Sequence, residues 1–232
     1  MSEMSSPGLL YYNGFDSSNC QFPNYPATIN SNQVHRSSWC STSGDARIFN
    51  GGGNSRGASF NNQDSYRIEY QRSANIVLGN TWTISVWVKS NTCSNNQIPL
   101  YFRTRTGTII YMIDHHARAT MSNGFIGRGH YGGTSCSGWQ NGWKHHVYQD
   151  TGSRFRVWVD GTEQSLATNN RNANGGMNGA WLQYLGSRPS WGTNGLGGYL
   201  DEMVIWNRVL TPEEVAGMYV LRGSNIKYGV NL

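Results

Sequence analysis

Hydrophobic and polar residues alternate along short segments of this chain, as they do in β-strands that bury one face. The clearest segment is Thr81 to Lys89, where one face of an extended chain carries Trp82, Ile84, Val86 and Val88 and the other carries Thr83, Ser85 and Trp87. The same pattern predicts strands at Pro99 to Arg103, Thr108 to Asp114, Trp143 to Gln149, Arg154 to Val159, Trp181 to Leu185 and Tyr199 to Trp206. Asn-Gly pairs and Asp160-Gly161 separate such segments, because these residues tolerate the positive φ of tight turns. The pattern predicts an all-β domain of two packed antiparallel sheets.

One short helix is predicted near the C-terminal end. Thr211 suits the N-cap, Pro212 the first helical position, and Glu214 completes a capping box three residues after Thr211. The helix is expected to end near residues 219–221. Residues 1–44 show no sustained periodicity and predict an irregular N-terminal arm, whereas 222–232 predict a tail or a last strand. The sandwich domain is therefore expected to occupy residues 45–221.

Asp201 and Glu202 are adjacent in the last predicted strand, so they are expected to point to opposite faces of the sheet. Strict alternation places Asp201 with Met203 and Ile205, and Glu202 with Leu200, Val204 and Trp206. One of the two carboxylates should then be buried and need hydrogen-bond partners. Opposite faces are the wrong geometry for two acids that share one substrate.

Composition narrows the class of protein. The chain has 232 residues, which suits one all-β domain, and its 9 Trp, 13 Tyr and 7 Phe supply a core although charged residues make up only 13%. The net charge is +5, but the arginines are spread singly along the chain, which disfavours a nucleic-acid partner. The first ten residues lack the pattern of a secretion signal, and no apolar run is long enough to span a membrane.

Four cysteines, Cys20, Cys40, Cys93 and Cys136, allow three disulfide pairings. Their spacing favours Cys20 with Cys40 and Cys93 with Cys136, and free buried thiols are the alternative. The absence of any Cys-x-x-Cys pair argues against structural zinc.

Three stretches in this order resemble the laminin-G-like, or concanavalin A-like, jelly roll over Ala46 to Leu221. They are Thr83 to Lys89; Trp143 to Val147 followed by Arg156 to Gly161; and Gly198 to Thr211. The resemblance implies a two-sheet sandwich. It also implies a recognition module, because most members of the family are non-catalytic and bind glycans or proteins, often with calcium. Fold alone does not fix the function.

The resemblance also directs attention to catalytic and metal-binding side chains. Polysaccharide-cleaving members present a Glu-x-Asp-x-x-Glu strand, which this chain lacks, and no Gly-x-Ser-x-Gly elbow occurs. The expectation is therefore that the protein is not an enzyme. His145 and His146 point to opposite faces and cannot chelate one metal together, and His145 falls where the family often has a packed histidine.

Calcium is the one cofactor that the resemblance suggests, held by carboxylates at the rim of the sandwich. Asp114, Asp160 and Asp201 are the candidate ligands. A hairpin turn explains Asp160 equally well, and structural hydrogen bonding is the favoured explanation for Asp201.

A glycan site needs an aromatic ring that stacks on a sugar and polar groups beside it. Among the predicted loops, the candidates for binding a glycan or a protein partner are Tyr131, Trp139, Trp191 and Asn194. Trp139 and Trp191 would otherwise cap the core or fill an interface.

These observations predict a non-enzymatic surface protein, placed first as a virion-associated decoration or host-attachment component. Three observations motivate that choice: a start at Met1 without a secretion signal, the predicted arm of 44 residues, and the low content of charged residues. The alternative is a secreted carbohydrate-binding module, and a polysaccharide lyase or hydrolase comes last. Expected partners are other virion or surface proteins, or cell-surface glycans, and the sequence leaves a homo-oligomer open.

Overall fold

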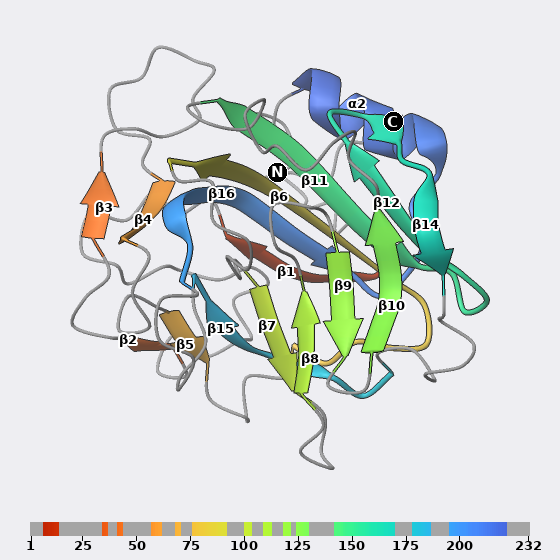
Figure 1. Cartoon of the computed structure of the whole chain (residues 1–232), viewed down its shortest axis with the longest axis horizontal. Helices are drawn as coiled ribbons and strands as arrows, with labels where there is room; N and C mark the ends of the chain where they lie inside the picture. Colours follow the sequence, from red (N-terminus) through yellow and green to blue (C-terminus); the bar gives the residue numbers. More distant parts are fainter. Residues whose placement is uncertain are drawn as a thin grey trace, which may run out of the picture.

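The fold is described from a computed structural model, over residues 7–13, 34–36, 41–43, 57–61, 68–70, 76–91, 100–103, 109–112, 118–121, 124–129, 142–169, 178–186 and 195–221. These residues form two antiparallel sheets and one helix (Figure 1). The predicted β-sandwich is confirmed. No helix within these ranges is long and apolar enough to cross a membrane.

Sheet A contains β6, the strand that was predicted at Thr81 to Lys89. Its order is β13 (Thr162–Glu163), β12 (Phe155–Val159), β11 (Trp143–Asp150), β6 (Trp82–Ser90), β16 (Gly197–Trp206), β4 (Gly57–Asn61) and β3 (Ser41–Ser43), with β1 (Leu9–Asn13) also paired to β16. Sheet B has the order β14 (Leu166–Asn169), β10 (Gly124–Gly129), β9 (Arg118–Met121), β8 (Ile109–Met112), β7 (Leu100–Arg103), β15 (Trp181–Leu185), β5 (Ile68–Tyr70) and β2 (Val34–Arg36).

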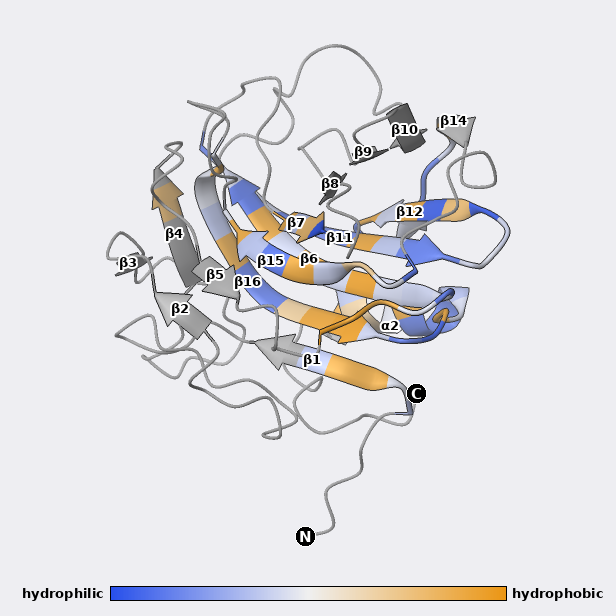
Figure 2. Ribbon diagram, turned by 90° about the horizontal axis from the view of Figure 1, so that it is seen from below, coloured by the Kyte–Doolittle hydropathy of each residue, from blue (hydrophilic) through white to orange (hydrophobic). Residues whose placement is uncertain are grey.

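Sheet A is buried on both faces along its central strands. Its inner face packs on sheet B through a core that includes Trp82, Ile84 and Phe102. Its outer face carries a second apolar cluster, with Trp158 and Trp206, beneath the helix α2 (Pro212–Leu221). Figure 2 shows the hydrophobic and hydrophilic residues alternating along these strands. The two-sided cover explains why Thr83, Ser85 and Trp87, on the second face of β6, are buried as well.

The turn and the capping box are confirmed. Asp160 and Gly161 join β12 to β13 as a two-residue turn, with φ of 49° and 76°. At the start of α2, the Glu214 N–H donates to Thr211 Oγ1 at 3.2 Å and the Thr211 N–H donates to Glu214 Oε2 at 2.8 Å. These local signals fix the position of α2 along the chain.

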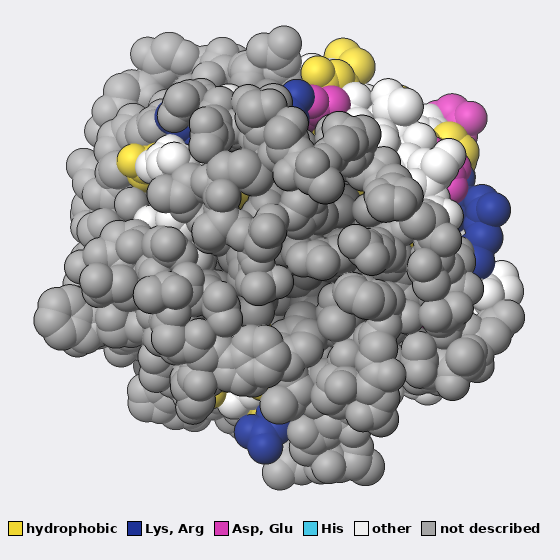
Figure 3. Space-filling view, in the orientation of Figure 1, with side chains coloured by type: hydrophobic (Ala, Val, Ile, Leu, Met, Phe, Trp, Pro, Cys, Tyr) yellow, Lys and Arg dark blue, Asp and Glu magenta, His cyan; other side chains and the backbone are white. Residues whose placement is uncertain are grey.

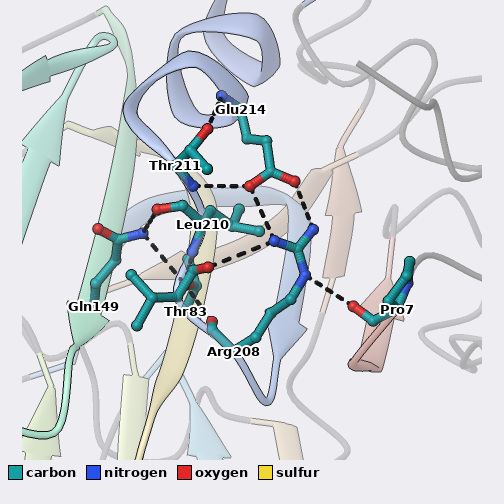
Figure 4. Close-up of polar contacts among 8 residues, drawn as sticks. Pro7, Thr83, Gln149, Arg208, Leu210, Thr211 and Glu214 are labelled. Carbon is teal, nitrogen blue, oxygen red and sulfur yellow. Dashed lines mark hydrogen bonds and ion pairs between the residues drawn. The ribbon is translucent and has the colours of Figure 1, made fainter.

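Polar contacts then hold α2 against sheet A (Figure 4). Arg208 donates two hydrogen bonds to the Glu214 carboxylate, at 2.9 and 2.6 Å, and a third to the Pro7 carbonyl at 2.9 Å. Thr83, buried in β6, donates to the Arg208 carbonyl at 2.7 Å and accepts from the Leu210 N–H at 3.1 Å. The loop between β16 and α2 is thus tied both to the sheet and to the N-terminal segment.

Residues 1–44 were predicted to form an irregular arm, but parts of this segment form strands. They contain β1, β2 and β3, of which β1 pairs with the second half of β16, and the Asn207 N–H donates to the Gly8 carbonyl at 2.7 Å. These strands have five residues or fewer, too few for alternation to stand out from the Ser- and Asn-rich sequence around them. The predicted domain limits stay predictions, and residues 222–232 lie outside the described ranges.

A bulge in β16 overturns the predicted faces of Asp201 and Glu202. Asp201 pairs with Trp87 but Val204 pairs with Ser85, so β16 has one residue more than β6 at this point, and Glu202 adopts a φ of 48°. Leu200 and Met203 consequently both enter the inner core. Asp201 therefore lies on the outer face with Trp87, not with Met203 and Ile205. The prediction that one of the two acids is buried is confirmed, since Asp201 is 2% exposed.

Candidate functional site

Most of the predicted site residues fall outside the described ranges. This holds for the glycan or partner candidates Tyr131, Trp139, Trp191 and Asn194, for the metal candidate Asp114, and for Cys20, Cys40, Cys93 and Cys136. Their predicted roles stay predictions. Asp160 and Asp201 are the predicted site residues that the structure describes.

Asp160 and Asp201 are not brought together. The Asp160 carboxylate accepts a hydrogen bond from Lys144 Nζ at 2.7 Å through Oδ2 and from the His145 N–H at 2.9 Å through Oδ1. Asp201 accepts the Glu202 N–H at 2.9 Å, and the strands β6 and β11 separate it from the Asp160 turn. Within the described ranges, no group of three or more His, Cys, Asp or Glu side chains is arranged to hold a metal.

The two adjacent histidines are packed on opposite faces, as predicted. His145 stacks on Trp87 with ring centroids 4.8 Å apart, and its Nε2 lies 2.8 Å from Ser85 Oγ. His146 Nδ1 lies 2.6 Å from the Tyr148 hydroxyl on the inner side. A serine beside a histidine is a catalytic pair only where a substrate can reach it, and both Ser85 and His145 are fully buried. The pair is structural.

The outer face of sheet B carries a different set of residues, which a second bulge aims outward. Leu182 and Leu185 in β15 both enter the core, and the register shifts between Leu182 and Tyr184. Gln183 and Tyr184 are therefore both displaced to the outer face. Tyr184 pairs with Tyr101 of β7, whose neighbours Leu100 and Phe102 are in the core. We name Gln183, Tyr184 and Tyr101 the tyrosine–glutamine site.

The tyrosine–glutamine site contains an unused hydrogen-bond acceptor. The two tyrosine rings meet at 5.3 Å with an interplanar angle of 51°, and Gln183 Nε2 donates to the Tyr184 hydroxyl at 2.9 Å. Gln183 is 8% exposed, and its Oε1 has no hydrogen-bond partner in the described structure. A buried polar atom without a partner costs about 1–3 kcal/mol, so its presence calls for an explanation.

One end of this face is open to solvent. Trp181 is half-buried and pairs with Arg103, which is exposed and lies two residues after Tyr101 on β7. An aromatic ring and a guanidinium thus lie beside the buried tyrosines. Figure 3 shows, at the rim of this face, Lys or Arg side chains of described residues next to Asp or Glu side chains.

The tyrosine–glutamine site was not among the predicted sites, because Trp181 to Leu185 was predicted only as a strand, with no bulge. The signal was nevertheless present. In Trp181-Leu-Gln-Tyr-Leu185, two leucines are separated by two residues, which no regular strand can place on one face. A bulge between them is needed to place both leucines in the core.

Comparisons with known proteins agree with the predicted resemblance. The profile of a laminin-G family, described as the Concanavalin A-like lectin/glucanases superfamily, matches residues 60–216, more than half of the chain. No curated protein matches the chain.

Three solved structures illustrate the shared fold. Domain 4 of an extracellular arabinanase from Geobacillus stearothermophilus, in complex with arabinotriose, has a TM-score of 0.64 and 16% identity over 93% of this chain and 100% of that domain. The binding domain of Paraclostridial Mosquitocidal Protein 1 has a TM-score of 0.62 and 15% identity over 96% of this chain and 55% of that one. A Trypanosoma rangeli sialidase has a TM-score of 0.57 and 14% identity over 95% of this chain and 34% of the sialidase. At these identities the likeness concerns the fold.

Proposed function

The chain belongs to the concanavalin A-like lectin/glucanases superfamily, and from this premise we propose that it is a non-catalytic carbohydrate-binding domain. The observation that carries the proposal is the buried, unpartnered Oε1 of Gln183 beside the Tyr101–Tyr184 pair. Sugars combine hydroxyl donors with apolar C–H faces, and the site offers an amide acceptor next to aromatic rings. The arabinanase domain that this chain matches over its full length was solved with arabinotriose, which supports a sugar ligand for a domain of this size.

The described acidic side chains support a role without catalysis. A glycoside hydrolase needs a carboxylic acid whose pKa is raised, together with a second carboxylate about 5–10 Å away. Here the hydrogen bonds from Arg156 lower the pKa of Glu163, and those from Arg208 lower the pKa of Glu214. Asp160 is paired with Lys144. Glu163 and Glu214 are thus held as anions by arginines on the side of sheet A, away from the tyrosine–glutamine site.

The proposal is tested by screening the protein on a glycan array and titrating the bound sugars calorimetrically. Gln183→Leu removes the free acceptor at nearly constant size and should weaken binding by roughly tenfold or more, equivalent to about 1.4 kcal/mol. Gln164→Leu, a half-buried glutamine after β13, is the matched control and should leave affinity unchanged. Gln183→Leu loses the hydrogen bond from Nε2 to the Tyr184 hydroxyl but also removes the buried, unpartnered Oε1, so its Tm should stay close to that of the parent protein.

Two results would contradict the proposal. One is an array on which no glycan binds the folded protein. The other is a bound glycan whose affinity is the same for Gln183→Leu and for the parent protein. Release of reducing ends from any bound polysaccharide would contradict the non-catalytic part alone.

A second candidate function is that of a structural component of an assembled extracellular surface, such as a virion decoration or host-attachment protein. The favouring observation is the low content of charged residues, 13% of the chain. Such a surface packs densely without strong repulsion between copies. Mass spectrometry of purified particles tests this role, and absence of the chain from them, or a monomer at all concentrations in light scattering, would count against it.

A further inference from the structure

A short row of side chains crosses the outer face of sheet B at the open end of the tyrosine–glutamine site. Trp181 of β15 is at its centre, bridged to Val77 on one side and paired with Arg103 of β7 on the other. Val77 is 44% exposed, Arg103 is exposed and Trp181 is half-buried. We name these residues the arginine–tryptophan row.

The backbone register directs the side chains of this row away from the core. Ile76 and Leu78 flank Val77 and lie in the core. Leu182, next to Trp181, also lies in the core, and its N–H donates to the Ile76 carbonyl at 3.2 Å. Directly opposite residues of antiparallel strands have Cβ atoms about 5 Å apart, so the row spans roughly 10 Å.

Arg103 brings a positive charge to one end of the row. Within the part of the chain that the structure describes, its guanidinium makes no hydrogen bond, ion pair or ring contact. Two arginines on the side of sheet A are engaged instead, Arg156 with Glu163 at 2.8 Å and Arg208 with Glu214 at 2.6 Å. The guanidinium of Arg103 therefore keeps its N–H donors, whose fork matches the two oxygens of a carboxylate.

The chemistry of the row selects a particular class of ligand. The indole ring of Trp181 and the exposed Val77 offer an apolar surface to the C–H face of a sugar ring, and the neighbouring guanidinium favours a carboxylate. A neutral sugar uses only the apolar part, and a small inorganic anion uses only the guanidinium. We propose that the arginine–tryptophan row binds sugar residues that carry a carboxylate.

This inference rests on the proposed function and deepens it, because it names the class of sugar. The row borders the tyrosine–glutamine site directly. Arg103 lies two residues after Tyr101 on the same face of β7, and Trp181 lies two residues before Gln183 on β15. The row is therefore the solvent-exposed end of the face on which the first site lies.

The experiment compares methyl β-D-glucuronide with methyl β-D-glucoside, which differ only in a carboxylate or a CH2OH group at C6. Binding is followed by NMR chemical-shift perturbation of the full chain. The parent protein should bind the glucuronide roughly tenfold more tightly, and raising NaCl to about 0.5 M should reduce that preference. The indole N–H signal of Trp181, identified among the 9 tryptophans by its loss in Trp181→Phe, should shift on titration.

Two exposed arginines provide a matched pair of variants. Arg103→Gln should abolish the preference for the glucuronide and leave the affinity for the glucoside unchanged. Arg154→Gln removes the same charge from an exposed position before β12 in sheet A and should keep the preference. Trp181→Ala should weaken the binding of both sugars, because it removes the surface on which their rings stack.

Several outcomes would overturn this inference: equal affinities for the two sugars, no binding of either, a preference that survives Arg103→Gln, or an unchanged indole signal of Trp181. The glycan array separates this failure from that of the proposed function. If other glycans bind and Gln183→Leu weakens them, only the assignment of a carboxylated sugar to the row is wrong. If no glycan on the array binds, the proposed function and this inference are both refuted.

Discussion

Replacing Thr83 with valine should loosen α2 from sheet A, because one buried hydroxyl group organises the loop before the helix. Thr83 is fully buried. Its Oγ1 donates to the Arg208 carbonyl at 2.7 Å and accepts from the Leu210 N–H at 3.1 Å and from Gln149 Nε2 at 3.3 Å (Figure 4). Valine keeps the shape and the strand preference of threonine, so the substitution isolates the hydroxyl group.

The magnitude follows from what each partner retains. Gln149 Nε2 keeps a bond of 2.8 Å to the Leu210 carbonyl, so its loss is small. The Leu210 N–H is left buried without its acceptor, at about 1–3 kcal/mol, and the bond to the Arg208 carbonyl is worth about 0.5–1.5 kcal/mol net. Thr83→Val should therefore lower the free energy of unfolding by about 2–4 kcal/mol. For a chain of 232 residues, this corresponds to a Tm lower by roughly 5–15 °C.

Urea denaturation followed by tryptophan fluorescence measures this difference, and an unchanged m-value confirms that the same surface unfolds in both proteins. Thr162→Val, at an exposed position in β13, is the control and should change stability by about 0.5 kcal/mol or less. A loss below about 0.5 kcal/mol for Thr83→Val would refute the reasoning, since it would mean that water or a shifted backbone replaces all three hydrogen bonds.

Two further predictions concern acid stability and a close backbone approach. Hydrogen bonding from Arg208, and to a smaller extent from the Thr211 N–H, lowers the pKa of Glu214, although burial opposes the shift. The stabilisation is therefore fully present above the ordinary carboxyl pKa of about 4.3 and is lost as the pH falls through the lower pKa of the folded protein. The Tm advantage of the parent protein over Glu214→Gln should accordingly shrink between about pH 5 and 3. An advantage that does not change with pH would contradict this assignment, and the exposed Glu213→Gln is the control. Gly186→Ala should destabilise the protein more than Gly179→Ala in a thermal melt: both glycines have positive φ, but an added Cβ at Gly186 would overlap the Phe60 ring, whereas Gly179 faces open space. Equal losses for the two variants would show that the Phe60 ring moves aside without cost.

Local sequence signals predicted much of the fold because they depend on near neighbours along the chain. Alternation in β6 assigned each side chain to its observed face, and the Thr211–Glu214 capping box fixed the start of α2. The two bulges, at Glu202 and Gln183, could not be read with the same rule. A bulge is set by the register between strands far apart in sequence, and one extra residue moves every later side chain to the other face.

The candidate sites depended even more on contacts between distant segments. Tyr101 and Tyr184 are more than 80 positions apart in the sequence and become neighbours only when β7 and β15 are paired. Gln183 has no distinguishing feature in the sequence, and only the structure shows that its Oε1 is buried without a hydrogen-bond partner. Trp139 and Trp191 could be predicted as binding residues from their residue type and their place in a loop. These two features carry no information on how strands are paired.

The strand β16 has β6 along one side, while its other side is shared by two strands in turn. β4 pairs with Gly197 to Leu200 and β1 pairs with Met203 to Trp206, so the change of neighbour falls at the bulge. Figure 2 shows β1 lying along this second half. Without residues 7–13, the backbone of the second half would present a bare strand edge beside the apolar cluster under α2, where a strand of another molecule could add. Residues 7–13 thus protect this strand edge from self-association. If a protein shortened by these residues precipitates, the cause would be the exposed strand edge rather than a weakened core.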